Sequence, residues 1–326
     1  MLKKAEFYTS HNDYSVTCRL CPKECQIKNN SSGFCKVRKN IDGVLYTNQY
    51  ASVAAINIDP MEKKPLYHFY PASTVLSIGA YGCNMSCGFC QNHHISVGNG
   101  FGQDVDVEQI ISFAINHNCP AIACTYNEPV VWYEFMYDIF KISKNNGLKN
   151  VLVTNGMINH EPLKTLIDVT DAANIDLKTF SQNSYKNLNG SLQTVKNTIK
   201  TFKDAKKHIE ISSLAVPDLW DDNIFEEMCR WLADIDAFIP LHINRYFPSY
   251  KYSLPPTRAD LLVKFKNIAD KYLNYVYIGN LDNNVTNNTK CHVCGATLIE
   301  RKGYESRLLL TEKKCLKCSA NIPIYL

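Results

Sequence analysis

Apolar positions follow two alternating patterns between residues 75 and 281. Short runs of apolar and β-branched residues predict buried strands, and the segments between them repeat apolar residues every three to four positions, as amphipathic helices do. The predicted strands span 75–82, 121–128, 150–156, 172–180, 208–217, 238–248 and 275–281. The predicted helices span 106–117, 130–146, 160–168, 192–207, 222–235 and 258–272. Strands that alternate with helices in this way predict parallel βαβ units, which together form an open or partial β/α barrel.

The chain divides into three parts by composition. Residues 1–73 form a cysteine-rich N-terminal extension with a short hairpin around 44–50, and residues 74–281 form the core. The asparagine-rich stretch 282–289 has the composition of a linker, and it opens a small C-terminal module at 282–326. The predicted fold class is therefore α/β, a partial (β/α)6-type barrel between two cysteine-bearing appendages. In such a fold we expect functional side chains at the C-terminal ends of the strands.

Composition describes an ordinary globular protein. The 326 residues are 45% hydrophobic and 20% charged, and the net charge of +4 is too weak to indicate nucleic-acid binding. The sequence has no apolar run long enough for a signal peptide or a membrane span. We therefore expect a cytoplasmic protein in a reducing compartment.

The fourteen cysteines change this picture. Eleven of them form three groups: Cys18, Cys21, Cys25 and Cys35; Cys83, Cys87 and Cys90; and Cys291, Cys294, Cys315 and Cys318. Close spacings suit thiolates that converge on a metal, and without an export signal this interpretation is favoured over disulfides. The remaining three, Cys119, Cys124 and Cys229, are expected to be buried core thiols.

The central group has three cysteines, C-x3-C-x2-C, directly after the first predicted strand. Three thiolates can hold three irons of a [4Fe–4S] cluster and leave the fourth iron open to a ligand that is not protein. An amino-acid amine and carboxylate would chelate such an iron well. The alternative is a zinc site that takes its fourth ligand from His93 or His94.

The segment "CNMSCGFC", with Phe89 just before the last cysteine, resembles the radical S-adenosylmethionine (radical SAM) enzymes. The resemblance implies a [4Fe–4S] cluster on Cys83, Cys87 and Cys90, with the methionine part of SAM on the open iron. An electron from the cluster then cleaves SAM to a 5′-deoxyadenosyl radical, which abstracts hydrogen from the substrate. This implies an enzyme that also needs a one-electron reductant.

Later strand ends agree with this resemblance. "TYNEP" ends the second strand, where the family carries residues that accept hydrogen bonds from the SAM amino group, so Asn127 and Glu128 become candidates. Thr154 and Asn155 end the third strand and are candidates for the same site.

"DLK" at the fourth strand resembles a motif of the glycyl-radical-enzyme activases. By that resemblance Lys178 faces the SAM carboxylate as a cation and Asp176 organises the site, although the two residues would also pair simply for stability. His242 on the sixth strand is a candidate contact for the adenosyl group, or else an interior histidine with its own partners.

Three further stretches narrow the family: residues 18–38, 59–71 and 239–252. With them the chain resembles the radical SAM member of the AmmeMemoRadiSam system, a relative of the pyruvate formate-lyase activases, over residues 15–320. This implies Memo-like and AMMECR-like partners and leaves the substrate open among proteins, peptides and small molecules. Val153 stands where activases carry an aspartate.

The activase pattern also differs on the fifth strand. Ser212 lies near the place of an activase arginine, and Asp218 replaces a glycine. These departures count against activation of a glycyl-radical enzyme, which remains the alternative function. A second alternative is a zinc-ribbon protein that binds RNA or protein.

The two outer cysteine groups differ in how specifically their spacing indicates a metal site. The C-terminal pair of knuckles has zinc-ribbon or rubredoxin spacing, so one tetrahedral zinc or iron is expected on all four thiols. The N-terminal C-x2-C-x3-C-x9-C set predicts one metal on four cysteines, as zinc or as a second cluster. The alternative there is that Cys35 is a separate core thiol.

Overall fold

The computed structural model describes residues 1–98, 100, 102–281 and 287–326. Its centre is a sheet of eight strands in the order β16-β15-β14-β13-β12-β11-β9-β8. Seven strands are parallel: β9 (Thr74–Gly79), β11 (Ala121–Cys124), β12 (Lys149–Thr154), β13 (Ala172–Asp176), β14 (His208–Ala215), β15 (Leu241–Arg245) and β16 (Val276–Gly279). The eighth, β8 (Ala55–Pro60), pairs antiparallel with β9 at one edge. The predicted α/β sheet of alternating βαβ units is therefore confirmed.

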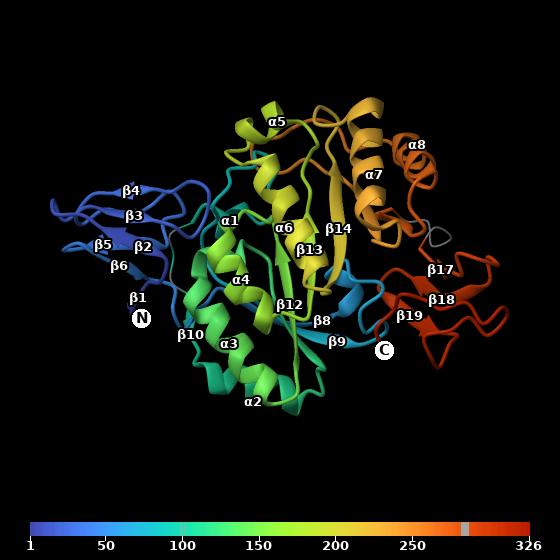
Figure 1. Cartoon of the computed structure of the whole chain (residues 1–326), viewed down its shortest axis with the longest axis horizontal. Coiled ribbons are helices and arrows are strands. Elements are labelled where there is room, and N and C mark those ends of the chain that lie inside the picture. Colours follow the sequence, from blue (N-terminus) through green and yellow to red (C-terminus); the bar gives the residue numbers. More distant parts are fainter. Residues whose placement is uncertain (99, 101, 282–286) are drawn as a thin grey trace.

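Helices follow the strands in turn and cover one face of the sheet (Figure 1). The long ones are α2 (Val107–Asn116), α3 (Tyr133–Asn145), α4 (His160–Val169), α6 (Leu192–Asp204), α7 (Asp222–Asp236) and α8 (Ala259–Ala269). The shorter ones are α1 (His93–Ser96), α5 (Gln182–Asn187) and the 3-10 turns η1 (Met61–Lys63) and η2 (Pro129–Trp132). Each long helix buries an apolar stripe; α6 buries Val195, Ile199 and Phe202, which share one face of the helix.

Residues 61–73, which we call the strap, connect β8 to β9 across the other face of the sheet. Met61, Leu66 and Phe69 of the strap form an apolar cluster with residues of β11, β12 and β13. The strand residues in this cluster are Ala121, Ala123, Val151 and Ala172, together with Val75 of β9. They alternate with residues that pack toward the helices, because successive side chains of a strand point to opposite faces. Small alanines on this inner face leave room for the strap.

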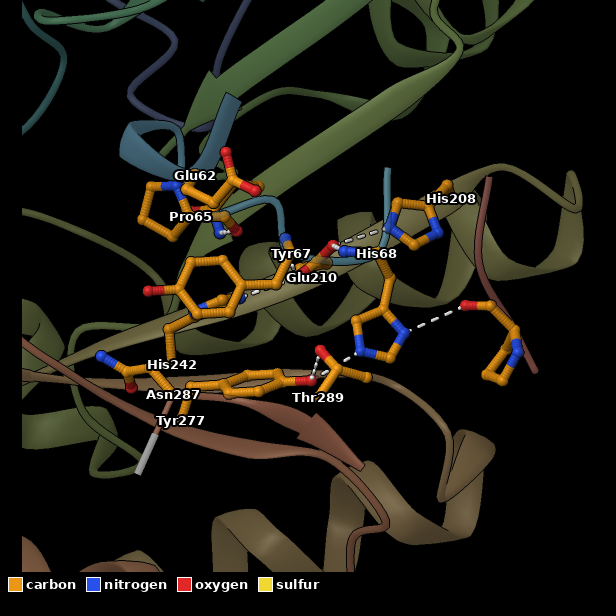
Figure 2. A network of polar contacts seen from close by, with 12 residues as sticks. Glu62, Pro65, Tyr67, His68, His208, Glu210, His242, Tyr277, Asn287 and Thr289 are labelled. Carbon is orange, nitrogen blue, oxygen red and sulfur yellow. Dashed lines mark hydrogen bonds and ion pairs between the residues drawn. The ribbon is translucent and has the colours of Figure 1, made fainter. Parts of the chain in front are cut away.

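Glu210 of β14 is the polar centre of the inner face (Figure 2). It is fully buried, and its carboxylate accepts hydrogen bonds from the backbone amides of Tyr67 (2.9 Å) and His68 (2.7 Å) in the strap. The imidazoles of His208 (2.9 Å) and His242 (2.7 Å) contact the same carboxylate. Burial opposes ionisation, but these two histidines outweigh it and hold the pKa of Glu210 well below its ordinary value.

A chain of hydrogen bonds leads from the strap to the C-terminal module. The Nδ1 of His68 lies 3.1 Å from the carbonyl oxygen of Pro323, and its Nε2 lies 2.7 Å from the hydroxyl of Tyr277. Since a carbonyl only accepts, Nδ1 carries the proton and Nε2 accepts from Tyr277. The hydroxyl of Tyr277 in turn contacts that of Thr289 at 2.8 Å, and Arg301 donates to Thr289 at 2.7 Å. The strap, the sheet and the C-terminal module are thus joined through a neutral His68.

Two small β modules flank the central sheet at opposite ends of the molecule (Figure 1). The N-terminal one contains β1 (Lys3–Lys4), β2 (Tyr8–Ser10), β3 (Val16–Cys18), β4 (Gln26–Ile27), β5 (Arg38–Ile41) and β6 (Val44–Thr47). A short pair follows, β7 (Ser52–Val53) with β10 (Gln103–Asp104). The C-terminal module contains β17 (Thr289–Lys290), β18 (Thr297–Lys302) and β19 (Glu305–Leu308).

The structure differs from the sequence-based expectations at β8 and at the ends of several strands. Strand β8 belongs to the central sheet, although residues 55–60 were expected in the N-terminal extension. The strand predicted at 121–128 ends at Cys124, and the one predicted at 172–180 ends at Asp176, so Asn127, Glu128 and Lys178 lie after their strands. Residues 282–286 of the expected linker lie outside the described residues.

The neutral His68 predicts a pH dependence of stability. Burial lowers its pKa to about 3, so the unfolded chain binds this proton below about pH 6.5 while the folded protein does not. The stabilisation is complete above about pH 6.5 and is lost as the pH falls toward 3. Replacing His68→Phe removes both hydrogen bonds, and we expect a loss of about 2 kcal/mol at neutral pH. The free energy of unfolding, measured from denaturation curves at pH values from neutral into this acid range, should therefore fall less steeply for the variant than for the wild type.

The matched control for this prediction is His160→Phe, because the side chain of His160 is 67% exposed. The control should keep the wild-type acid dependence. If His68→Phe and wild type lost stability in parallel through this range, the assignment of a neutral buried His68 would be wrong.

Candidate functional site

A cavity of about 940 Å³ opens at the C-terminal ends of the parallel strands. Its lining includes Thr125, which follows β11, and Gly279, at the end of β16. These strands lie toward opposite edges of the sheet order, so the sheet curves around the cavity. Tyr67 of the strap and Tyr304, between β18 and β19, also line it. Both the strap and the C-terminal module therefore contribute walls to one site.

The three-cysteine loop forms one side of this cavity. Cys83, Cys87 and Cys90 all line it, and each is partly buried. The segment after β15 holds the loop, because Ser249 donates to the carbonyl of Cys90 at 3.1 Å and the amide of Lys251 donates to that of Gly88 at 2.8 Å.

Glycine is required at position 88 for this contact. A Cβ there would lie 2.8 Å from the ring of Tyr252, so a side chain would push the two segments apart. The neighbouring Phe89 is 3% exposed and packs edge-to-face on Tyr252, with ring centroids 5.5 Å apart. Phe89 lines the cavity as well, beside the cysteines.

Asn127 lines the cavity but uses its side-chain amide to hold the start of the cysteine loop. Its Oδ1 accepts from the amide of Ala80 at 3.1 Å and from the indole of Trp132 at 3.3 Å. Its Nδ2 donates to the carbonyl of Gly82 at 2.9 Å. The structure thus gives Asn127 a positioning role toward the loop.

Glu128 joins the ends of two neighbouring strands. Its carboxylate accepts from the hydroxyl of Thr154 at 2.7 Å and from the amides of Asn155 at 2.8 Å and Val130 at 3.1 Å. Burial raises the pKa of Glu128 to about 7, and the three hydrogen bonds limit the rise. Asn155 also approaches the cysteine loop, with its Nδ2 at 3.8 Å from the sulfur of Cys83. The structure brings these predicted residues together on one wall.

Asp176 and Lys178 form an ion pair at the cavity, with Nζ 2.6 Å from Oδ2. Burial disfavours the charged lysine, but the carboxylate of Asp176 and the nearby Cys87 outweigh it and raise the pKa of Lys178. The backbone amide of Lys178 donates to the hydroxyl of Tyr185 at 3.0 Å, which fixes the turn after β13. A permanent cation therefore stands beside the cysteine loop.

The histidine candidates occupy different places. His242 lines the cavity, yet it is 2% exposed and its Nε2 is already bonded to Glu210 (Figure 2). His93 stacks on the ring of Tyr250, and its Nδ1 lies 3.3 Å from the carbonyl of Cys90. Among the described residues, neither His93 nor His94 is part of a close group of metal-ligand atoms, which disfavours a zinc site at this loop.

Sequence reasoning missed a polar cluster around Asp59, next to the cavity. Asp59 accepts from Lys63 at 2.8 Å, from Lys64 at 2.7 Å and from the hydroxyl of Tyr126 at 2.5 Å. Burial opposes ionisation, but these partners hold the pKa of Asp59 well below its ordinary value. Both lysines and Tyr126 line the cavity. The signal was present in residues 59–71, which carried the resemblance to a family but suggested no role.

The C-terminal cysteines form a compact group. The sulfurs of Cys291 and Cys318 lie 3.6 Å apart, as do those of Cys294 and Cys315. All four lie within 4.8 Å of one another. A tetrahedral ion with metal–sulfur bonds of about 2.3 Å places its ligands about 3.8 Å apart, so the group fits one zinc or iron ion.

Comparison with known proteins gives the family. The profile of the radical SAM superfamily matches residues 77–232. An uncharacterized protein of Methanocaldococcus jannaschii, MJ0808, is 40% identical over the full length of both chains. This chain belongs to the radical SAM superfamily.

Two kinds of relative add detail. A second protein of M. jannaschii, MJ1227, provisionally named a glycyl-radical enzyme activating enzyme, is 26% identical over 64% of this chain and 90% of its own. The pyruvate formate-lyase 1-activating enzyme of Escherichia coli is 29% identical over 33% of this chain and 47% of its own. Among solved structures, Streptococcus suis SuiB bound to S-adenosylmethionine superposes with a TM-score of 0.51 at 14% identity, covering 63% of this chain and 52% of that one. That similarity concerns the fold alone.

Membership makes this radical SAM protein an enzyme that uses a [4Fe–4S] cluster and SAM. The site fits both: three cysteines face a cavity that also holds a cation and several polar groups. Among the described residues, none of the helices has the length and apolar composition needed to cross a membrane.

The role of Asn127 yields a prediction about the cluster loop. Asn127→Ala removes two hydrogen bonds that hold Ala80 and Gly82 and a third from the indole of Trp132, so we expect a loss of about 3 kcal/mol in stability. We also expect faster loss of iron to a chelator, measured by absorbance, because the loop is freed. Asn116→Ala, at an exposed end of α2, is the control and should change neither quantity. Unchanged iron loss in Asn127→Ala would contradict the positioning role.

Proposed function

We propose that this radical SAM enzyme is the radical SAM member of the AmmeMemoRadiSam system, and that it abstracts hydrogen from a protein, peptide or small-molecule substrate. The observation that carries the proposal is the arrangement of the three sequence stretches behind the resemblance: residues 59–71 and 239–252 line the cavity, and residues 18–38 pack against the start of the cysteine loop.

Each stretch has a distinct place at the site. In residues 18–38, the backbone of Cys35 lies against Gly82, directly before the cysteine loop. Residues 59–71 supply most of the strap and two lysines, Lys63 and Lys64, that line the cavity. Residues 239–252 supply Ser249 and Lys251, which bond to the loop. Because each of the three stretches contacts the cysteine loop or lines its cavity, their arrangement supports a shared substrate or partner.

The chain's own groups suggest how the site works. When bound, the cluster supplies the electron that cleaves SAM, and the resulting 5′-deoxyadenosyl radical abstracts hydrogen. Lys178 would face the SAM carboxylate as a cation, and Thr154 and Asn155 would shape the adjoining wall. Asn127 would hold the start of the cysteine loop in place, and Glu128 would hold the ends of the neighbouring strands together. Walls from the strap and the C-terminal module would limit water access to the radical.

Activation of a glycyl-radical enzyme is the second candidate, and the names of MJ1227 and the E. coli relative favour it. Two features of this site count against it. Val153 lines the cavity in place of an acidic residue, and Ser212 is buried with a hydroxyl that lacks a hydrogen-bond partner. This candidate predicts an electron-resonance doublet from a glycyl radical on a partner protein.

The cluster assignment leads to a direct prediction. Cys87→Ala should abolish the broad absorption of the cluster near about 400 nm from this site and the formation of 5′-deoxyadenosine from SAM. Cys229→Ala is the control, because Cys229 is a buried thiol of α7 far from any cysteine group in sequence. The control should retain SAM cleavage. A Cys87→Ala protein that still cleaves SAM would contradict the assignment.

The proposed partners are tested by a rate measurement. We expect the anaerobically reconstituted, reduced enzyme to form 5′-deoxyadenosine slowly by itself and several-fold faster with the Memo-like or the AMMECR-like protein. The comparison uses an unrelated protein of equal concentration as a control. A slow rate that neither partner changes would refute the partnership while leaving the radical chemistry intact.

A further inference from the structure

The four N-terminal cysteines surround a second, smaller cavity. Cys18, Cys21, Cys25 and Cys35 all line it, although they come from different strands and turns of the N-terminal module. The cavity has a volume of about 20 Å³. All four cysteines therefore border one space, which disfavours Cys35 as a separate core thiol.

The size of this space distinguishes it from the C-terminal site. Four sulfurs that bind one zinc ion at about 2.3 Å leave no room between them for a water-sized sphere. The C-terminal cysteines are that compact, with all sulfurs within 4.8 Å of one another. Among the described residues, neither the N-terminal thiols nor the three thiols of the radical SAM loop form so close a group. The N-terminal thiols are therefore spaced more widely than the C-terminal ones, as the thiols of the radical SAM loop are.

Arg38 supplies a second, independent indication of a ligand. It lines the same cavity and is 1% exposed, and its Nη2 donates to the carbonyl of Glu6 at 2.8 Å and to Glu134. Its Nε and Nη1 are buried without a hydrogen-bond partner. A buried guanidinium N–H group without an acceptor lowers the stability of the folded protein. An anionic group with sulfur acceptors would provide the missing hydrogen bonds.

We propose that Cys18, Cys21, Cys25 and Cys35 hold a second [4Fe–4S] cluster. Four thiolates complete the coordination of such a cluster, so, unlike the first, it has no open iron for SAM. The cluster with its four thiolates is an anion, which Arg38 would face. Zinc on the same four cysteines is the outcome that the test must separate from it.

The two cluster sites are neighbours. A Cβ on Gly82 would lie 2.7 Å from the carbonyl oxygen of Cys35, so the N-terminal loop packs directly on the residue before Cys83. Asn84, the residue after Cys83, lines the N-terminal cavity. Asn155 donates to Asn84 at 2.9 Å, which ties this contact to the active-site wall.

This position gives the second cluster a role in electron transfer. The residues that line the two cavities do not overlap, so an electron from a low-potential one-electron donor would enter beside the N-terminal module without crossing the substrate cavity. The second cluster takes up one electron and passes it to the first, and no bond is made or broken in this step. The first cluster then holds the electron that SAM cleavage consumes.

The experiment combines metal analysis with electron paramagnetic resonance of the full-length protein, purified and reconstituted without oxygen. The wild type should contain about eight cluster irons per chain, and Mössbauer spectroscopy separates these from a single tetrahedral iron at the C-terminal site. A triple variant, Cys83→Ala, Cys87→Ala and Cys90→Ala, should retain about four irons. Reduced with dithionite, it should show the signal of one [4Fe–4S] cluster that SAM does not change.

The reciprocal variant is Cys25→Ala, with Cys229→Ala as its matched control. Cys25→Ala should lose about four irons and keep the SAM-sensitive signal of the first cluster, whereas the control keeps both clusters. In reduced wild type, the spectrum should differ from the sum of the two variants, because neighbouring clusters interact magnetically. A triple variant without iron, together with two zinc ions per wild-type chain, would overturn the proposal even if SAM cleavage by the wild type were normal.

Discussion

The buried carboxylate of Glu210 is the constraint on which the arrangement of this enzyme depends. A charge with no access to water is costly unless every part of it is paired, and Glu210 meets this condition with two backbone amides and two imidazoles. The amides belong to the strap, so the strap cannot leave the inner face without uncovering the charge. His68, one of the strap residues bonded to Glu210, continues the network to the C-terminal module. One interaction therefore positions two of the walls that enclose the cavity.

The periodicity of the sequence was sufficient to predict the alternating strands and helices of the core, because each element buries an apolar face that its own residues define. The strap could not be predicted in this way. Its residues pair with Glu210 and Tyr277, more than a hundred positions away, and nothing local in "PLYHFYP" specifies those partners. Strand β8 was missed for a different reason: its apolar and polar residues alternate, but Asp59 is buried while Ile58 is 40% exposed, so the burial is the reverse of what the pattern predicts.

Residues of the candidate site could be predicted where binding a metal requires a fixed spacing of ligands along the chain. They were harder to predict where their role depends on contacts in the folded structure. The three central cysteines and the polar strand ends lie together around one cavity, as the motif and the parallel topology imply. Their individual roles are not readable from the sequence. The side chains of Asn127 and Glu128 make hydrogen bonds to other groups of the protein. Asp59 and its two lysines form a polar cluster at the cavity that no motif indicated. Whether a cysteine group is compact or wide likewise depends on how its loops fold, which the spacing along the chain does not show.

The central claim is that SAM binds through its methionine part to a cluster on Cys83, Cys87 and Cys90. Electron–nuclear double resonance of the reduced enzyme, with SAM isotopically labelled at the amino nitrogen, tests it most directly. We predict a nitrogen coupling to the cluster spin that is present in wild type and absent from the triple cysteine variant. A wild-type cluster whose spectrum is unchanged by SAM, with no nitrogen coupling, would contradict the claim.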